Sequence, residues 1–462
     1  MGVAANLFFN TTSPQETLDW RIRPSDEQYD KQKERWGILR DYLIDDLRAK
    51  SSCAMSSWLQ GSYKFGTQVR PAKKEQEFDI DLGIYFQWAG APEDGDWTPS
   101  ELKDMVQNSL VRYLDDDEND AEGVSEPKER CNRIHFADNF HIDVPSYHLE
   151  PTEDERSLAT ESDDWETSDP KAIYKWWVDS FDDNTRPRVR RIVRYAKMWA
   201  ALKFSDSQRP SSILLTVLVA EAFSSFDTST LNGDDEFFCA VISSIIDRLE
   251  TSFSVPNPAY PDENLNRLSD DDNNNFLENL EELISICDRA LASASIAASA
   301  EIWSEAFKYF FPIPEEIDLF AKSENALIPI GFDPIVDITA TPQGQSAKFF
   351  QGQNKLGPIP KNCSIRFSLA NAHQLPQGAI VTWTVRNEGE EAENENDLGH
   401  INGMGLRTEE TSAYKGRHHM DVAVKLNGTL IGFRRVPVTI AGLGLPPRNP
   451  RRPDYVKFRR KR

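Results

Sequence analysis

Phe78-Asp79-Ile80-Asp81-Leu82 is the stretch that decides the fold of the N-terminal part of this 462-residue chain. Side chains of a β-strand alternate between its two faces, so the three apolar residues share one face, which we assign to the core. Asp79 and Asp81 then share the other face. Two carboxylates held a few ångströms apart repel each other unless a cation lies between them. The alternation therefore predicts a strand that presents oxygen ligands to a metal ion such as Mg²⁺.

A second alternating run, Phe140 to Val144, supplies a third carboxylate. His141 and Asp143 share one face of this run, and Asp143 reaches the same metal cluster if the two strands pack side by side. Three carboxylates are what a two-metal site requires, in which one ion activates a hydroxyl and the other holds a triphosphate. We therefore predict that Asp79, Asp81 and Asp143 are the catalytic residues and bind two Mg²⁺ ions, for which Mn²⁺ can substitute.

A phosphate-binding turn is predicted upstream, at Gly61-Ser62-Tyr63-Lys64-Phe65-Gly66-Thr67. A glycine turn that leads into a helix offers free N–H groups and a positive dipole to phosphate. Gly61 allows a close approach of the backbone, and the Ser62 hydroxyl adds a hydrogen bond.

A cationic partner for the phosphates is predicted on a helix at Arg186 to Phe204. Arg190, Arg194 and Lys197 fall beside its apolar face by helical spacing, and Lys197 is placed to point at a triphosphate. The alternative is that these cations form the solvated edge of an amphipathic helix.

The remaining sequence pattern predicts which segments of the chain are helical and which form strands. Ser25 and Gln28 have the spacing of a capping box and predict a helix that runs to about Lys50. Residues 133–136 and 140–147 predict a hairpin, and the acid-rich segments 115–120 and 150–169 predict exposed loops. Helices are then expected at 170–181, 186–204, 212–226, 237–253, 275–292 and 300–310. Strands are expected at 335–341, 364–369, 380–387, 419–426 and 429–437, which indicates an antiparallel sandwich with Trp383 in or near its core.

Composition narrows the class of protein. The formal net charge of −23 disfavours binding to duplex DNA, although metal ions and a few cations can still hold small nucleotides. No apolar run approaches the length of a membrane span and no secretory signal is seen, so no membrane contact and a cytoplasmic location are expected. Five widely spaced cysteines argue against a disulfide framework or zinc ribbon. Cys131, His135, His141 and His148 are interpreted as hairpin residues rather than zinc ligands, and no metal site is assigned to His400, His418 and His419.

These motifs resemble the polymerase-β-like nucleotidyltransferase superfamily, and within it the CD-NTases, bacterial relatives of cyclic GMP-AMP synthase and oligoadenylate synthase in antiphage signalling systems (CBASS). The resemblance also covers Arg191 to Trp199 and Pro210-Ser211-Ser212. It implies that Lys197, Ser211 and Ser212 contact the donor triphosphate and that Asp143 helps to deprotonate the acceptor hydroxyl. Residues 381–389 and 409–418 resemble the AGS-C domain, a β module proposed to act as a sensor.

The expected fold is α+β: a nucleotidyltransferase core with a helical lobe and a C-terminal β-sandwich. We expect a palm at residues 1–160, a helical lobe at 161–327, an AGS-C-like domain at 328–445 and a basic tail at 446–462. The leading hypothesis is a synthase that joins NTPs or dNTPs, ATP among them, into a short cyclic oligonucleotide second messenger read by a downstream effector. The alternatives are a linear RNA or DNA oligonucleotide product, with or without a protein primer, and a catalytically silent nucleotide-binding sensor or scaffold. The sequence leaves the oligomeric state open.

Overall fold

The computed structural model describes residues 2–116, 119–137, 139–314, 331–343 and 349–441. The chain divides into two compact units, Met1–Leu319 and Phe320–Arg462. The basic tail expected at 446–462 lies outside the described residues.

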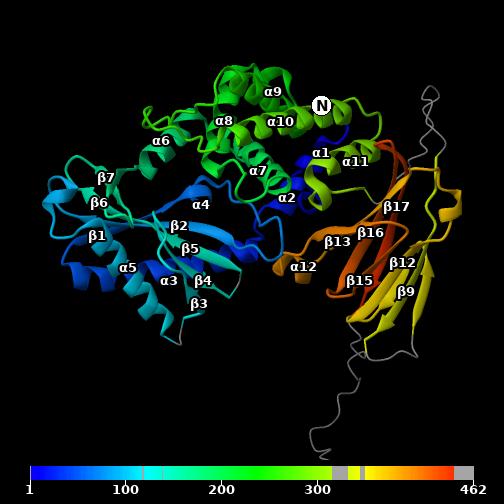
Figure 1. Ribbon diagram of the computed structural model, residues 1–462, viewed down its shortest axis with the longest axis horizontal. Helices are drawn as coiled ribbons and strands as arrows, with labels where there is room; N and C mark the ends of the chain where they lie inside the picture. Colours follow the sequence, from blue (N-terminus) through cyan, green and yellow to red (C-terminus); the bar gives the residue numbers. More distant parts are fainter. Residues whose placement is uncertain (1, 117–118, 138, 315–330, 344–348, 442–462) are drawn as a thin grey trace, which may run out of the picture. The chain divides into compact units, whose positions relative to one another are not determined.

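The first unit is built on one mixed sheet (Figure 1). Its central strand β2 (Phe78–Gln87) pairs antiparallel with β1 (Ala54–Gln60) and parallel with β5 (Phe140–Val144) and β6 (Ser146–Glu150). Within the described residues, eight strands follow the order β3-β4-β5-β2-β6-β7-β8, with β1 joined to β2. The other four strands are β3 (Ala121–Val124), β4 (Asn132–Phe136), β7 (Glu155–Ala159) and β8 (Trp165–Thr167).

The apolar face of β2 packs on two helices, α3 (Asp26–Ser51) and α5 (Pro99–Leu114). The predicted capping box is confirmed, because Ser25 accepts from Gln28 N while the Gln28 side chain accepts from Ser25 N. Alternation along β2 therefore leaves its aspartates on the opposite face. The shared core contains Leu39, Leu43, Leu47, Phe78, Ile80, Leu82, Leu102, Val106 and Leu110.

The helical half of the first unit lies on the other side of the sheet, above it in Figure 1. All six predicted helices are present with shifts of a few residues at their ends. An additional short helix, α1 (Ala5–Phe8), belongs to this half, because the Phe8 ring lies 4.8 Å from Trp303 and 5.3 Å from Tyr195. The remaining helices of the unit are α2 (Leu18–Ile22), α4 (Gly61–Phe65), α6 (Pro170–Ser180), α7 (Arg186–Lys203), α8 (Ser212–Ser225), α9 (Asp234–Thr251), α10 (Asp270–Leu291) and α11 (Ile296–Phe307).

Two predictions for the sheet are wrong. The acidic segment 150–169 is not an exposed loop, since β7 and β8 continue the sheet there. Its residue Arg156 is buried and donates to Asp169 at 2.8 Å, so an ion pair stands beside the buried Leu158 and Ala159 in a segment whose composition is otherwise acidic. The run 140–147 is not one strand either, because it breaks at Pro145 into β5 and β6, which pair with successive parts of β2.

The second unit consists of two sheets, in the orders β10-β9-β12-β15 and β11-β17-β16-β13-β14. Their pairing is antiparallel except for β11 with β17. Trp383 is fully buried in the core and donates to Gly405 O at 2.7 Å, which confirms its predicted place. The elements are β9 (Val336–Pro342), β10 (Phe350–Gln353), β11 (Leu356–Ile359), β12 (Cys363–Leu369), β13 (Ile380–Arg386), α12 (Glu390–Asn394), β14 (Gly399–Met404), β15 (Arg407–Thr411), β16 (Gly416–Leu426) and β17 (Thr429–Ile440).

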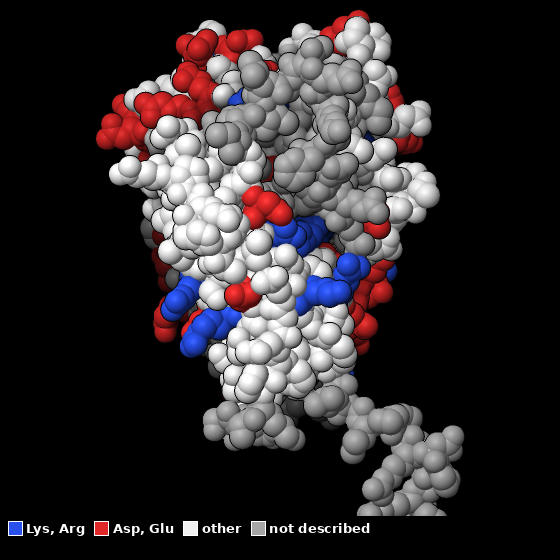
Figure 2. Space-filling model, turned by 90° about the vertical axis from the view of Figure 1, so that its right-hand side faces the viewer, with Lys and Arg blue, Asp and Glu red and all other residues white. Residues whose placement is uncertain are grey.

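The acidic charge is unevenly distributed over the surface. On the face shown in Figure 2, Lys and Arg side chains form a broken band across a largely uncharged surface, and most acidic side chains lie toward its margins. In the described part of the chain, none of the helices combines the length and the apolar character needed to cross a bilayer.

Candidate active site

The three predicted aspartates lie in two rows that cross neighbouring strands. β2 and β5 place Asp79 opposite His141 and Asp81 opposite Asp143, and β4 adds Arg133 opposite Asp143. Residues in register on adjacent strands project to the same face of the sheet. The structure therefore brings Asp79, Asp81 and Asp143 together on the face that alternation predicts.

Asp81 lies against the turn that begins α4. Gly61 there has a φ of +57°, and a Cβ added to it would lie 1.9 Å from Asp81 Oδ2. Only glycine combines this left-handed backbone with so close an approach. Burial raises the pKa of Asp81 well above its ordinary value, and the charges of Asp79 and Asp143 raise it further. Negative charge is thus crowded at this point, which a divalent cation would relieve.

Asp143 is held by an arginine that the motif analysis did not include. Arg133 Nε lies 2.5 Å from Asp143 Oδ1, and a terminal guanidinium nitrogen lies 2.7 Å from Oδ2. Burial raises the pKa of the Asp143 carboxyl, but the hydrogen bonds and charge of Arg133 outweigh burial and hold that pKa below its ordinary value. Asp143 is therefore a carboxylate that stays ionised.

The cations of α7 are not a solvated edge, as the alternative interpretation had it. Arg190 Nε donates to Phe65 O at 2.9 Å, Arg194 donates to Gly66 O at 2.8 Å, and Lys197 Nζ donates to Thr67 Oγ1 at 3.0 Å. Three cations one helical turn apart thus bind three consecutive residues at the C-terminal end of α4. Their arrangement fixes the predicted phosphate-binding turn against the helical half.

Lys197 is buried, and no acidic side chain lies in direct contact with its ammonium group among the described residues. Burial lowers the pKa of this lysine to about 7, Arg194 lowers it too, and the charges of Asp81 and Asp79 oppose the shift. An anion placed beside a buried ammonium group strongly stabilises the charged form of that group. That is the electrostatic behaviour expected of a residue that receives a phosphate.

An open cleft of about 470 Å³ lies at this site, lined by Asp79 and Lys197 among others. Its volume is within the usual range for small-molecule sites. Of the predicted residues, Ser62, Asp79, Lys197 and Ser212 line the cleft. Asp81 lies against Gly61, and Asp143 is paired with Arg133, which itself lines the cleft. Ser211 instead caps α8, where its Oγ accepts from Leu214 N at 3.2 Å. The lining also includes Thr67 of the predicted turn, and residues that the motif analysis missed, among them Glu77, Arg133 and Arg209.

The donor set fits an oxygen-ligated divalent ion. Carboxylate oxygens of Asp79 and Asp143 and a ring nitrogen of His141 all lie within 4.8 Å of one another. Asp81 adds a further carboxylate, whose pKa is raised by burial and then by the charges of Asp79 and Asp143. Hard oxygen donors beside a cleft large enough for a nucleotide suit magnesium, which keeps positions open for waters and phosphates.

Fold and cleft together define a nucleotidyltransferase. Residues 56–147 match the family model of the cyclic GMP-AMP synthase DncV-like nucleotidyltransferase domain, and residues 319–441 match that of the adenylyl/guanylyl and SMODS C-terminal sensor domain. The chain is a CD-NTase with a C-terminal sensor domain, as the resemblance indicated.

Two curated relatives align with different shares of the chain. A cyclic GMP-AMP synthase of Escherichia albertii is 28% identical over 448 residues, which cover 94% of this chain and 96% of the relative. A c-di-GMP synthase of Roseivirga ehrenbergii is 25% identical over 297 residues, covering 55% and 74%.

Solved structures show the same fold. Escherichia coli DncV bound to 3'-deoxy GTP superposes with a TM-score of 0.55 at 22% identity, over 66% of this chain and 96% of that one. Vibrio cholerae DncV in complex with GTP and 5MTHFGLU2 gives 0.56 at 22% identity, over 67% and 97%. At this level of sequence identity, these likenesses show the fold alone.

Proposed function

We propose that this protein joins nucleoside triphosphates into a short cyclic oligonucleotide second messenger, in the form of a cyclic dinucleotide. The observation that carries the proposal is the grouping of Asp79, Asp81 and Asp143 on one face of the sheet, with Asp79 lining the same cleft as Lys197 and Ser62. The cyclic product is supported by the relative from Escherichia albertii, a cyclic GMP-AMP synthase aligned over nearly its whole length.

Different residues of the cleft bind the donor triphosphate and the metal ions. Lys197, buried at the cleft with a lowered pKa, receives the donor triphosphate, and Ser62 at the start of α4 adds a hydroxyl and the free N–H groups of that turn. Asp79, Asp81 and Asp143 would hold two magnesium ions. When bound, these ions supply Lewis-acid stabilisation of the phosphates and lower the pKa of the acceptor hydroxyl.

The role of Asp143 is refined by its partner. A carboxylate whose pKa lies below its ordinary value is a weak proton acceptor, so we assign Asp143 to cation binding and to orientation of the acceptor rather than to proton abstraction. Arg133 keeps that carboxylate ionised and fixed in position. Arg133 is therefore proposed as a positioning residue.

In the cell, this activity would serve antiphage defence in the cytoplasm. The messenger would be read by a separate effector protein, and the C-terminal sensor domain would govern when synthesis occurs, as the description of its family suggests. A linear oligonucleotide remains an alternative product, and a silent nucleotide-binding scaffold an alternative function.

The test is incubation with all eight nucleoside triphosphates and Mg²⁺, one labelled at a time, followed by the mass of the product. The proposal expects pyrophosphate release and a labelled product that resists phosphatase, because a cyclic dinucleotide has no terminal phosphate. A phosphatase-sensitive product would establish a linear messenger. Absence of any product, with each triphosphate shown to bind, would support the scaffold and overturn the proposal.

A further inference from the structure

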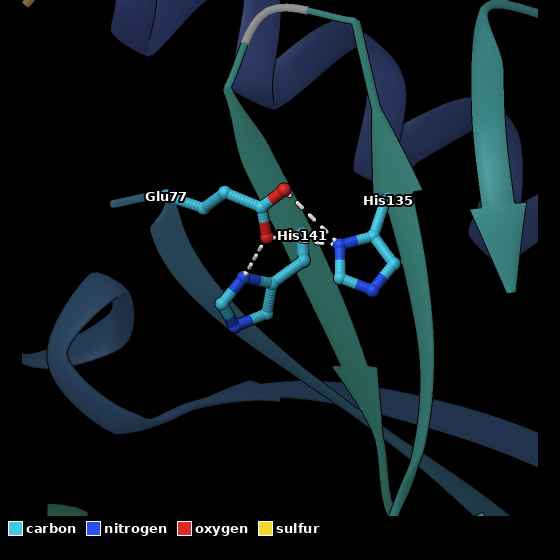
Figure 3. A group of neighbouring side chains, drawn as sticks. All are labelled: Glu77, His135 and His141. Carbon is cyan, nitrogen blue, oxygen red and sulfur yellow. Dashed lines mark hydrogen bonds and ion pairs between the residues drawn. The ribbon is translucent and has the colours of Figure 1, made fainter. Parts of the chain in front are cut away.

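Beside the aspartates lies a cluster to which the proposed function assigns no role: Glu77, His135 and His141 (Figure 3). Glu77 Oε2 lies 2.8 Å from His141 Nδ1 and 2.9 Å from His135 Nδ1, and Glu77 Oε1 lies 3.1 Å from the same His135 atom. One carboxylate thus faces two imidazole rings at once.

Strand register explains why these residues meet. His135 and His141 are directly opposite each other in the antiparallel pair β4 and β5, so their side chains share a face. Glu77 immediately precedes β2 and has the same parity as Asp79, which places it on that face too. On the opposite face Phe136 and Phe140 stack at 4.8 Å, which anchors the hairpin in the core. The cluster is therefore built on rigid elements.

The second nitrogen of the two rings differs in its surroundings. His135 Nε2 lies 2.7 Å from Ser125 Oγ, a contact that orients the ring and leaves Nδ1 toward Glu77. His141 Nε2 is buried and lies 2.9 Å from Asp79 Oδ1, but no hydrogen bond is directed to it from the described residues. His141 is thus wedged between two carboxylates, Glu77 and Asp79, which neutral imidazole cannot satisfy together because it carries only one N–H.

We propose that Glu77, His135 and His141 bind one transition-metal ion of the zinc class, at a site separate from the oxygen-ligated ions expected at the aspartates. Two histidines and one glutamate are a frequent ligand set of Zn²⁺ that leaves a coordination position open. Imidazole nitrogen favours zinc and related ions, whereas carboxylate oxygen favours magnesium, so a site with two histidines selects a different metal from the three aspartates.

The distances allow this ion. The three ligand atoms all lie within 4.8 Å of one another. Zinc–nitrogen bonds of about 2.0–2.1 Å place tetrahedral ligand atoms roughly 3.3 Å apart. The Glu77 contacts would widen slightly and the two rings would approach, which small side-chain rotations achieve. Glu77 and His135 are about one-third exposed, so an ion can enter from the cleft.

The ion would act as a clamp on the active site. Bound through Nδ1, it fixes the His141 ring with Nε2 directed at Asp79 Oδ1. Occupancy of the site thereby orients the carboxylate of Asp79 without supplying a group to the reaction. The inference stands apart from the proposed function, because metal binding is measured without turnover.

The test is titration of metal-stripped full-length protein with Zn²⁺ in saturating Mg²⁺, by calorimetry and by metal analysis after dialysis. One Zn²⁺ per chain is expected. His135→Ala should weaken binding at least about 100-fold, and Ser125→Ala about 10-fold, since loss of an outer-shell partner costs 10–100-fold in metal affinity. His148→Ala is the matched control: that histidine lies on β6, bonds to Trp88 O at 3.1 Å and should leave binding unchanged.

Two further variants keep the outcome unambiguous. Glu77→Gln preserves the shape of the cluster, so it tests the ligand charge if His135→Ala fails to fold, and it should also lose the ion. Asp81→Asn should retain Zn²⁺. Zinc binding that survives His135→Ala and Glu77→Gln but disappears in Asp81→Asn would place the ion among the aspartates and overturn the proposal. So would absence of zinc binding to the wild-type chain, which would leave a purely hydrogen-bonded cluster.

Discussion

Replacement of Gly61 by alanine should separate catalysis from stability. The left-handed backbone at φ +57° costs an alanine about 1–2 kcal/mol relative to glycine. The added Cβ would also lie 1.9 Å from Asp81 Oδ2. A carboxylate end can rotate away cheaply, so we expect little further loss of stability. The displaced carboxylate, however, would leave the position in which it faces Asp79 and Asp143.

Misplacement of a reacting group by about 1 Å can cost 10²-fold in rate, so Gly61→Ala should lower turnover at least about 10²-fold. Gly66→Ala, at the other end of α4, is the matched control. Its φ is +69°, and its Cβ would meet the Arg190 side chain, with Nε at 3.2 Å, so it carries a similar backbone cost without touching an aspartate. Both variants should show similar melting temperatures, and pyrophosphate release should distinguish them. Equal turnover in the two would refute the assignment of Asp81 to the reacting centre.

Two further predictions concern charges that the fold buries. Triphosphate binding at about pH 8 should take up close to one proton, because the pKa of Lys197 is about 7 in the free protein and an added anion raises it. Calorimetry in buffers of different ionisation enthalpy measures this proton uptake. The uptake should vanish in Lys197→Met and should fall toward zero below about pH 6, where the lysine is already charged. Unchanged proton uptake in the variant would contradict the role of Lys197. In the β unit, Asp421→Asn should destabilise the fold by about 3–5 kcal/mol, because it leaves Arg386 and Arg435 buried without their shared carboxylate. Burial raises the pKa of Asp421, but the two arginines hold it below 3.8, so the stabilisation is present above that pH and is lost as the pH falls through the lower folded value. Thermal unfolding across pH should therefore show the gap between variant and wild type narrowing in acid, and a gap independent of pH would contradict the ion-pair account.

Alternation and helical spacing were enough to predict the main features of the site. Period-two alternation around Asp79 and Asp143 identified strands with one buried and one polar face, and the structure has them in that arrangement. Period-3.6 spacing placed Lys197 beside the apolar face of α7, where it now lines the cleft. Such patterns are local, so a sequence displays them directly.

Features that depend on strand register were not predictable in this way. Arg133 reaches Asp143, and His135 reaches His141, only because a tight turn sets which residues of β4 and β5 face each other. Glu77 joins them because β2 runs parallel to β5 in a particular register. Strands β7 and β8 were missed for a different reason, since a buried ion pair such as Arg156 with Asp169 gives a strand the composition of a loop.

The most direct test of the central claim is pyrophosphate release by the wild-type chain compared with Asp79→Asn and Asp81→Asn, each with Mg²⁺ and the triphosphates that the wild type uses. Asp104→Asn, an exposed position on α5, controls for the loss of one acidic charge. If the carboxylates of β2 bind the catalytic ions, both variants should lose at least about 10³-fold in rate, with melting temperatures near or above that of the wild type because crowded negative charge is relieved. Turnover in Asp79→Asn and Asp81→Asn close to that of Asp104→Asn would contradict the account.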